Sequence, residues 1–498
     1  MSNPLRSGLV IAGMRMLAMA CSFGLSWLIA RQAVDDLGAY RTLLTFFFFL
    51  ESLPLLGMQQ YVMRQTALEP HKAGRLFLHS LLLGVGVAIV AAAGVAGLGE
   101  TGWYSARVSR GLFIVAAGIP GAVVYLSSCH LLLGLDKGAT YGILTALETV
   151  VRVALGAACL FWRGDVVWII GAFVVTRYLF CAVYIRSLWP WLRDTPWMLD
   201  RGLLRDYIRH LPVFAGILAL SLVARHSAML WLAQMRGDEG AGFYGAANML
   251  VDVGLLIPTA VSLCLMPRFA RWGEKALGQL GTACTSGLEV MSLCVLPFTA
   301  LVCLLAQPIV LLLFHKRLAS GAPAYAGAVP VLQILVWQCV LMSIDQVLSV
   351  AMIAAKKQTL DLLSLAVNAL AMLVALPLCI SVEGPGGAAR GLIIGSVAGL
   401  GTRILLARRA MPGFQPGAAL WRPVCGCLAL VALLALLPPG VHFVARAAAG
   451  LLTYAVVIVA VGALGRSRRQ AMAELLHTET LEPAAISPAD SSGNLVLG

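Results

Sequence analysis

The sequence has little charge for its length. Only 12% of the residues are Asp, Glu, Lys or Arg, and 60% are apolar. A soluble globular protein carries about 25% charged residues. The shortage therefore argues against a soluble globular fold.

The sequence also lacks the motifs of soluble enzymes. It contains no phosphate-binding Walker loop, no nucleophile elbow and no pair of histidines at metal-ligand spacing. No hydrophilic loop is long enough to fold as a separate catalytic domain. We expect a protein that is not an enzyme, with no catalytic residues and no cofactor.

Cysteine is present but scattered. The 12 cysteines occur almost always singly. Cys425 and Cys427 form a Cys-x-Cys pair, but they lie in an apolar run with no histidine or carboxylate nearby. Small apolar core residues are the expected interpretation, and no metal site is predicted.

What the sequence has in abundance is apolar runs of about 20 residues, the length that crosses a bilayer of about 30 Å as a helix. They predict an all-α polytopic membrane protein with about 14 transmembrane helices. Leu9–Ala30 is too long for the apolar part of a signal peptide, so we expect it to be the first span. The predicted spans are residues 8–30, 39–60, 76–98, 111–133, 141–162, 166–188, 208–233, 243–267, 284–305, 327–354, 359–381, 388–408, 419–437 and 441–464.

The basic residues indicate the orientation in the membrane. The chain has 36 Lys and Arg against 23 Asp and Glu, and the charges lie mainly between the spans. This pattern does not point to nucleic acid, which would require one basic patch. With the N-terminus inside, the inner segments carry most of the Lys and Arg, as the positive-inside rule requires. An even number of spans then places both termini in the cytoplasm.

A faint internal repeat divides the chain. Gly38-Ala39-Tyr40 opens one span and Gly242-Phe243-Tyr244 opens another, with Glu51 and Asp252 at similar distances beyond. The repeat predicts two six-helix lobes that run in the same direction and face each other across a cavity. The predicted units are a first lobe with its cytoplasmic linker (1–206), a second lobe (207–410), an added helix pair (411–464) and a disordered cytoplasmic tail (465–498).

Four arginines lie inside predicted spans. An arginine at the centre of a membrane helix costs about 2.5–3.5 kcal/mol, so such residues are expected to face a protein-lined or wet interior. Glu148 and Arg152 stand four residues apart in the acid-first order, which favours a pair on one helix. The four are Arg15, Arg152, Arg177 and Arg225.

Carboxylates also lie inside predicted spans. In a transporter they could bind a coupling ion, or they could pair with the arginines, and the residues leave both alternatives open. Asn248 lies one turn before Asp252 and would share its helix face. The carboxylates are Glu51, Glu148, Asp252, Glu289 and Asp345.

Three stretches resemble a known family. Residues 14–45 hold the first helix and the Gly-x-Tyr start of the second, and residues 237–272 hold a Gly-x-Tyr-x-x-Ala core and a terminal Met-Pro. Residues 352–400 complete the pattern. Together they resemble polysaccharide-unit flippases of the Wzx type, in the multidrug/oligosaccharidyl-lipid/polysaccharide (MOP) exporter superfamily, over roughly residues 8–410.

The resemblance implies transport without covalent chemistry. The expected substrate is an undecaprenyl-diphosphate-linked oligosaccharide, moved from the inner to the outer leaflet of the bacterial inner membrane for exopolysaccharide, capsule or O-antigen synthesis. The fold would be MATE-like, with membrane lipids as partners and a polysaccharide polymerase and co-polymerase as candidate partners. Arg15 and Arg225, supported by Arg152 or Arg177 and by Asn248, would hold the diphosphate, because arginine's forked charge suits phosphate. Family members often carry an acid where this chain has Arg225-His226, and that departure favours a phosphate-facing role.

Other functions remain as alternatives. A peptidoglycan-precursor lipid flippase would also handle a lipid diphosphate. An ion-coupled multidrug exporter of the same superfamily would want an acidic or apolar cavity, which the four arginines oppose. A membrane polysaccharide polymerase is disfavoured by the short outer loops.

Overall fold

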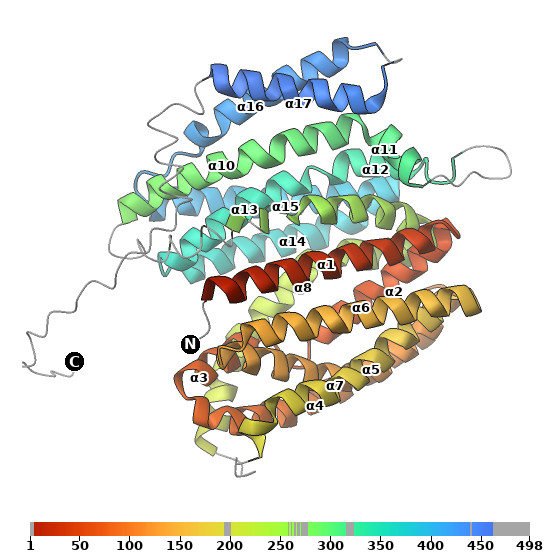
Figure 1. Cartoon of the computed structure of the whole chain (residues 1–498), viewed down its shortest axis with the longest axis vertical. Helices are drawn as coiled ribbons and strands as arrows, with labels where there is room; N and C mark the ends of the chain where they lie inside the picture. The colour runs from red at the N-terminus through yellow and green to blue at the C-terminus, as the bar shows by residue number, and fades with distance from the viewer. Residues whose placement is uncertain are drawn as a thin grey trace, which may run out of the picture.

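The protein is helical throughout the part that is described. The structure is a computed structural model and describes residues 4–193, 201–256, 277–314, 323–438 and 441–461, together with scattered residues between 258 and 269. These residues form helices and turns, and the long helices run side by side along one direction (Figure 1).

The helices follow one another with short connections. Those of the first half of the chain are α1 (Pro4–Ala30), α2 (Val34–Ser52), α3 (Gln59–Leu68), η1 (Pro70–Lys72), α4 (Ala73–Glu100), α5 (Ala106–Gly134), α6 (Gly138–Arg163), α7 (Val166–Leu192) and α8 (Arg201–Gly254). Those of the second half are α10 (Leu277–Leu304), α11 (Ala306–Leu313), α12 (Ala328–Leu335), α13 (Gln338–Ala354), α14 (Gln358–Glu383), α15 (Pro385–Ala410), α16 (Pro416–Leu436) and α17 (Phe443–Ala460).

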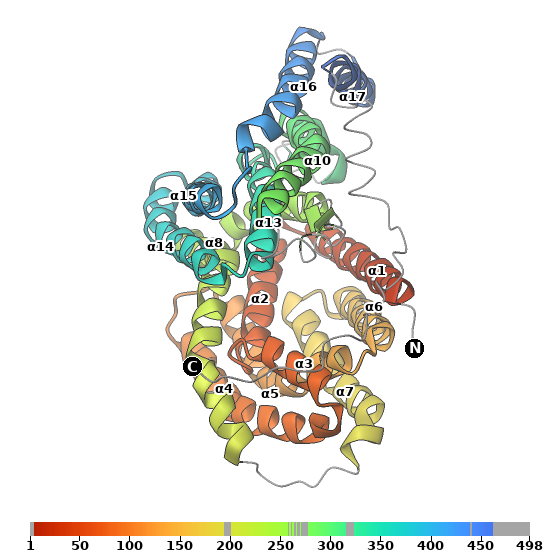
Figure 2. The same cartoon turned by 90° about the vertical axis from the view of Figure 1, so that its left-hand side faces the viewer.

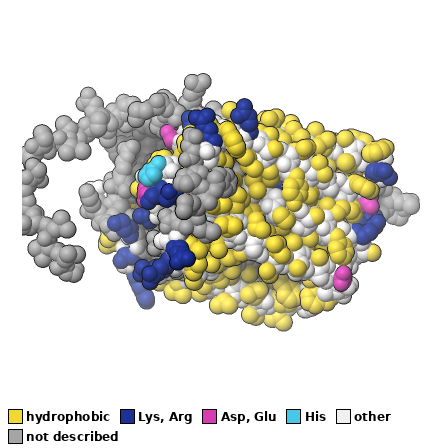
Figure 3. Space-filling view, turned by 90° about the horizontal axis from the view of Figure 1, so that it is seen from below, with side chains coloured by type: hydrophobic (Ala, Val, Ile, Leu, Met, Phe, Trp, Pro, Cys, Tyr) yellow, Lys and Arg dark blue, Asp and Glu magenta, His cyan; other side chains and the backbone are white. Residues whose placement is uncertain are grey.

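The predicted all-α, multi-pass fold is confirmed. Among the described residues, 11 helices are long and apolar enough to cross a membrane, and α1 adds a shorter apolar stretch at Met16–Ala30. On the face shown in Figure 3, hydrophobic side chains cover the middle, and charged side chains collect at the two ends. The predicted tail at 465–498 lies outside the described residues, as do most residues from 263 to 276.

Two predicted boundaries differ from the structure. The span expected at 39–60 is broken, because α2 ends at Ser52 and the chain turns through Leu56 and Gly57, both with positive φ, before α3. The spans expected at 208–233 and 243–267 are joined within α8, which kinks at Gly237 (φ 69°, ψ −165°). Only glycine adopts that backbone conformation readily, so one residue replaces the expected loop.

Helices α2 and α8 run between two groups of helices. On one side α4, α5 and α7 pack together and α1 packs on α6; on the other side α14 packs on α15 and α13 on α10 (Figure 2). Helices α16 and α17 lie at the far edge, against α10. The division into units at residues 206, 410 and 464 stays a prediction.

The glycines of the predicted repeat lie where α2 and α8 cross. A Cβ atom on Gly38 would lie 1.8 Å from the carbonyl oxygen of Asp238, and one on Gly242 would lie 2.2 Å from that of Val34. Only a hydrogen side chain allows the two backbones to come this close. The Gly-x-Tyr motifs therefore mark the crossing itself.

We expect Gly38→Ala to separate α2 from α8 and to lower the midpoint temperature of unfolding of the purified protein. Overpacking typically costs 1–3 kcal/mol, and here the obstacle is backbone, which cannot rotate away. Gly24→Ala is the matched control, because a Cβ there meets nothing within 4 Å. Equal midpoints for the two variants in a thermal melt would contradict the close crossing.

Candidate functional site

The line between α2 and α8 holds the first candidate site. Helix α2 and the turn that follows it lie along α8 from Gly38, beside Asp238, to Gly57, where a Cβ would lie 2.4 Å from the carbonyl oxygen of Phe214. Midway, the rings of Phe49 and His226 meet edge to face, with centroids 6.0 Å apart. Side chains along this line therefore lie between the two groups of helices.

An ion pair crosses this line. Arg41 on α2 lies 3.0 Å from Asp252 on α8, and Asn248 donates a hydrogen bond of 3.1 Å to the same carboxylate oxygen. The predicted proximity of Asn248 and Asp252 is thus observed, but Arg41 was missed. The repeat could have identified Arg41, because it directly follows Gly38-Ala39-Tyr40. Its side chain packs over Gly245, which is the matching position of the second motif.

A buried charge cluster lies inside the first group of helices. Arg177 on α7 lies 3.0 Å from Glu51 on α2 and 3.1 Å from Glu148 on α6. The hydroxyl of Tyr184 donates to the other oxygen of Glu148 at 3.1 Å, and the guanidinium of Arg177 stacks over the ring of Tyr125 at 3.6 Å. The side chain of Arg177 is only 3% exposed.

The expected pair between Glu148 and Arg152 is not the one that forms. Glu148 contacts Arg177 from the neighbouring helix instead. The guanidinium of Arg152 lies 5.7 Å from the ring centroid of Phe48 and 5.1 Å from that of Phe173, and it has no carboxylate partner among the described residues. The reason is physical. Glu148 already contacts Arg177 on the neighbouring helix and accepts a hydrogen bond from Tyr184, so its charge is stabilised without a direct contact to Arg152.

A related cluster lies in the second group of helices. Arg403 on α15 pairs with Asp345 on α13 and, at 2.9 Å, with Asp361 on α14. Ser349 donates to Asp361 at 3.1 Å. The sequence pattern indicates Asp345 but not Arg403 or Asp361, because both stand near the ends of their predicted spans.

The intramembrane carboxylates therefore all have arginine partners. Glu51 and Glu148 contact Arg177, Asp252 contacts Arg41, Asp345 contacts Arg403, and Glu289 contacts Arg422 at 3.2 Å. The last pair joins α10 to α16. Of the two alternatives left open by the sequence, these contacts favour charge pairing over ion binding.

Arg225 differs from the other described intramembrane arginines. Its side chain is exposed, and it has no ion-pair partner among the described residues. It lies next to His226, whose ring packs against Phe49 between the two groups of helices. The side chain of Arg15 lies outside the described residues. Arg177 was expected to help hold the diphosphate. Its guanidinium already pairs with two carboxylates, so it is not available for that role.

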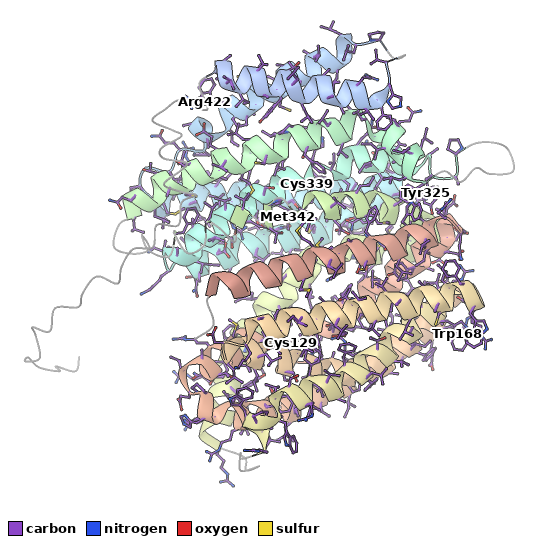
Figure 4. All side chains as sticks on the ribbon, in the orientation of Figure 1. Cys129, Trp168, Tyr325, Cys339, Met342 and Arg422 are labelled. Carbon is purple, nitrogen blue, oxygen red and sulfur yellow. The ribbon has the colours of Figure 1, made fainter. Side chains whose placement is uncertain are left out.

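The two groups of helices are sealed together at one end. Figure 4 places Trp168 and Tyr325 at this end and Arg422 at the opposite one; the charge pattern predicts that the Tyr325 end is outside, and it is called the outer end below. Trp27 donates to the carbonyl oxygen of Leu313 at 2.9 Å, and Tyr325 donates to that of Ala30 at 2.8 Å.

Charged and polar contacts complete the outer seal. Arg107 pairs with Asp36, and Ser105 donates to Asp238 at 2.7 Å. The hydroxyl of Tyr104 faces the carbonyl oxygen of Leu230 at 3.5 Å, and burial raises the pKa of Tyr104 to about 12. That hydroxyl therefore stays protonated, and able to donate, over the whole physiological pH range.

No metal centre is found in the described part of the chain. Its His, Cys, Asp and Glu residues form no group of three that could hold an ion. Cys425 is exposed and Cys427 buried, and both are free thiols.

Comparison with known proteins gives two family matches. The family described as polysaccharide biosynthesis protein matches residues 5–272, which is more than half of the chain. The MatE family matches residues 216–380. No curated protein matches.

Solved structures share the fold at low identity. The lipid II flippase MurJ, in an inward closed conformation, is 14% identical with a TM-score of 0.77, over 93% of this chain and 100% of that one. A multidrug resistance MATE family transporter of the MOP superfamily, inward-facing, is 17% identical with a TM-score of 0.61, over 80% and 97%. A MOP superfamily transporter from Pyrococcus furiosus is 16% identical with a TM-score of 0.60, over 82% and 96%.

We expect Arg177→Met to destabilise the protein strongly, because it removes the arginine that contacts both Glu51 and Glu148 and leaves an excess buried negative charge. Removing one partner of a buried pair costs about 3–5 kcal/mol. The double variant Arg177→Met, Glu51→Gln should recover most of that loss, since the remaining buried charges, Glu148 and Arg152, then balance each other. Thermal or denaturant unfolding in detergent measures both. A double variant no more stable than Arg177→Met would show that the cluster is not held by charge neutralisation.

Proposed function

The chain belongs to the polysaccharide biosynthesis protein family of the MOP superfamily, and on that premise we propose that it is a lipid-linked oligosaccharide flippase. It translocates an undecaprenyl-diphosphate-linked oligosaccharide from the inner to the outer leaflet of the bacterial inner membrane, for exopolysaccharide, capsule or O-antigen synthesis. The work is done by binding and conformational change, without covalent chemistry.

One observation carries the proposal: Arg225 is a mid-span arginine with an exposed side chain and no acid partner among the described residues. A cation in this position is expensive unless it faces water or an anion. The carboxylates that could have neutralised it are each occupied by another arginine. A diphosphate head group is an anion that would satisfy Arg225, and the guanidinium fork suits it.

The outer seal supports alternating access. With Trp27 bonded to Leu313 and Tyr325 bonded to Ala30, the outer end is closed in this structure. A substrate could reach Arg225 only from the inner leaflet or from within the membrane. Rocking of two lobes, residues 1–206 and 207–410, would open the outer end and release the head group.

Partners follow from the same proposal. Membrane lipids contact the apolar surface, and the polyprenyl tail of the substrate would remain among them. A polysaccharide polymerase and co-polymerase would receive the exported unit. We place both termini in the cytoplasm.

A peptidoglycan-precursor flippase is the second candidate. The observation in its favour is length: the MurJ fold spans 93% of this chain, against 80% for the MATE transporter. Because identity is 14%, this likeness concerns the fold. Rescue of cells depleted of their own lipid II flippase would favour this candidate over an oligosaccharide flippase. An ion-coupled multidrug exporter is less well supported, because the intramembrane carboxylates are paired.

We expect Arg225→Ala to reduce export at least about tenfold, since a hydrogen bond to a charged group contributes about 1.5–3 kcal/mol. Lipid-linked oligosaccharide should accumulate on the inner leaflet, where it can be extracted and quantified. Arg225→Lys should rescue little, because an ammonium group does not reproduce bidentate contact with a diphosphate.

Arg110→Ala is the matched control, because Arg110 lies exposed at the outer end, 4.0 Å from Asp165 and away from the α2–α8 line. It should export normally. Membrane abundance and size-exclusion profiles verify that each variant is inserted and folded. Normal export by a folded Arg225→Ala would overturn the role assigned to Arg225, and no accumulation on depletion of the whole protein would overturn the function.

The outer seal gives a second prediction. Ser105→Cys combined with Asp238→Cys, in a background without the native cysteines, should be joined by a short bis-methanethiosulfonate reagent, because the native side chains hydrogen bond at 2.7 Å. Cross-linking should stop flipping in proteoliposomes, and a reductant should restore it. The single variant Ser105→Cys should be insensitive to the reagent. Full activity of the cross-linked protein would show that this contact need not open.

A further inference from the structure

Two neighbouring cavities open at the outer end, beside the crossing of α2 and α8. One has a volume of about 520 Å³ and lies between α8, α12 and α15; the other, of about 420 Å³, lies between α2, α5 and α8. Arg236 and Glu239 line both. We call the pair the outer vestibule. Volumes of this size suit a small-molecule ligand or a few sugar units.

Most charged side chains of the outer vestibule already have hydrogen-bond or ion-pair partners within the protein. Arg236 donates to the carbonyl oxygen of Ile380 at 3.1 and 3.2 Å and also to that of Ser381, so it caps the C-terminal end of α14. Arg390 pairs with Glu383. Arginines used in this way are poor receptors for an added phosphate.

Two carboxylates of the outer vestibule differ from these paired groups. Asp35 and Glu239 are exposed and have no hydrogen-bond or ion-pair partner in the described part of the chain. An ionised carboxylate can only accept hydrogen bonds, so its natural partners are hydroxyl and amide donors. Their negative charge repels a diphosphate at the same place.

The larger cavity has an aromatic ring and two prolines among its lining residues. Phe243 lies with its ring against the backbone of Gly327, where a Cβ would come within 3.1 Å of three ring atoms. Pro330 and Pro385 stand beside it. Glu239 lines the same cavity as Phe243, and Asp35 lines the smaller cavity that shares Glu239. Carboxylate acceptors near an aromatic ring suit a ligand that carries hydroxyl groups on its edge and C–H groups on its faces, as a sugar does.

From this arrangement we propose that the outer vestibule binds the oligosaccharide part of the substrate after it leaves the central cavity, with Asp35 and Glu239 accepting hydrogen bonds from sugar hydroxyls. The inference rests on the proposed function. It assigns the two ends of the substrate to separate places: the diphosphate to the cationic region at Arg225, and the sugars to an acidic outer site that rejects phosphate.

The test uses the full-length protein in lipid nanodiscs. The probe is the oligosaccharide released by mild acid from the lipid-linked material that accumulates when the protein is depleted in cells. Isothermal titration should show saturable binding to the unaltered protein. Glu239→Gln and Asp35→Asn should each weaken binding by about tenfold or more, because a carboxylate acceptor is lost. Glu100→Gln, an exposed carboxylate at the end of α4 outside the vestibule, should bind as the unaltered protein does.

Three results would overturn the proposal. They are no saturable binding by the unaltered protein, equal binding by Glu239→Gln and Asp35→Asn, or displacement of the oligosaccharide by inorganic pyrophosphate. The proposed function fails in a different way, at the earlier step, when depletion produces no lipid-linked material. The two failures are therefore distinguishable.

Discussion

Neutralising buried arginines is the constraint on which the rest of the structure depends. Moving an ion from water into the protein interior costs several kcal/mol even after relaxation, and only a well-placed counter-charge offsets it. Arg177 and Arg403, whose side chains are 3% and 5% exposed, each draw carboxylates from two other helices. Each contact fixes the depth of one helix against another. Within each group of helices, charge pairing therefore sets the register that apolar packing alone would leave adjustable.

Charge balance also separates structural arginines from a candidate ligand-binding arginine. Arg177 with two carboxylates leaves one excess negative charge, and Arg152, one helical turn from Glu148, restores neutrality to this deeply buried region. The matching cluster around Arg403 has no second arginine, but its carboxylates are 27% and 20% exposed and so keep part of their hydration. Arg225 fits neither pattern. Among the described mid-span arginines, it is the one whose positive charge is not balanced by a carboxylate of the described protein.

The sequence predicted the class of fold well because hydropathy and helix length are local properties. The repeat also singled out Gly38 and Gly242, and the structure shows that these glycines lie where α2 and α8 cross. Which arginine pairs with which carboxylate was harder to predict. Glu148 and Arg152 have ideal spacing on one helix, yet Arg177 from the next helix takes the carboxylate. Arg41 was missed for the same reason: a pair between helices depends on how the helices are rotated against each other, which no single stretch encodes.

The strengths of these contacts determine how the molecule can move. Breaking a cluster such as that of Arg177 would expose buried charge at a cost of about 3–5 kcal/mol. Opening the outer seal exchanges hydrogen bonds such as Trp27 to Leu313 and Tyr325 to Ala30 for bonds to water, at a net cost of about 0.5–1.5 kcal/mol each. The pair of Arg41 and Asp252 crosses between the groups, but the Asp252 side chain is 44% exposed, so water can replace its partner. Each buried cluster is therefore harder to break than any single hydrogen bond of the seal, and this difference supports the proposed rocking about the α2–α8 line.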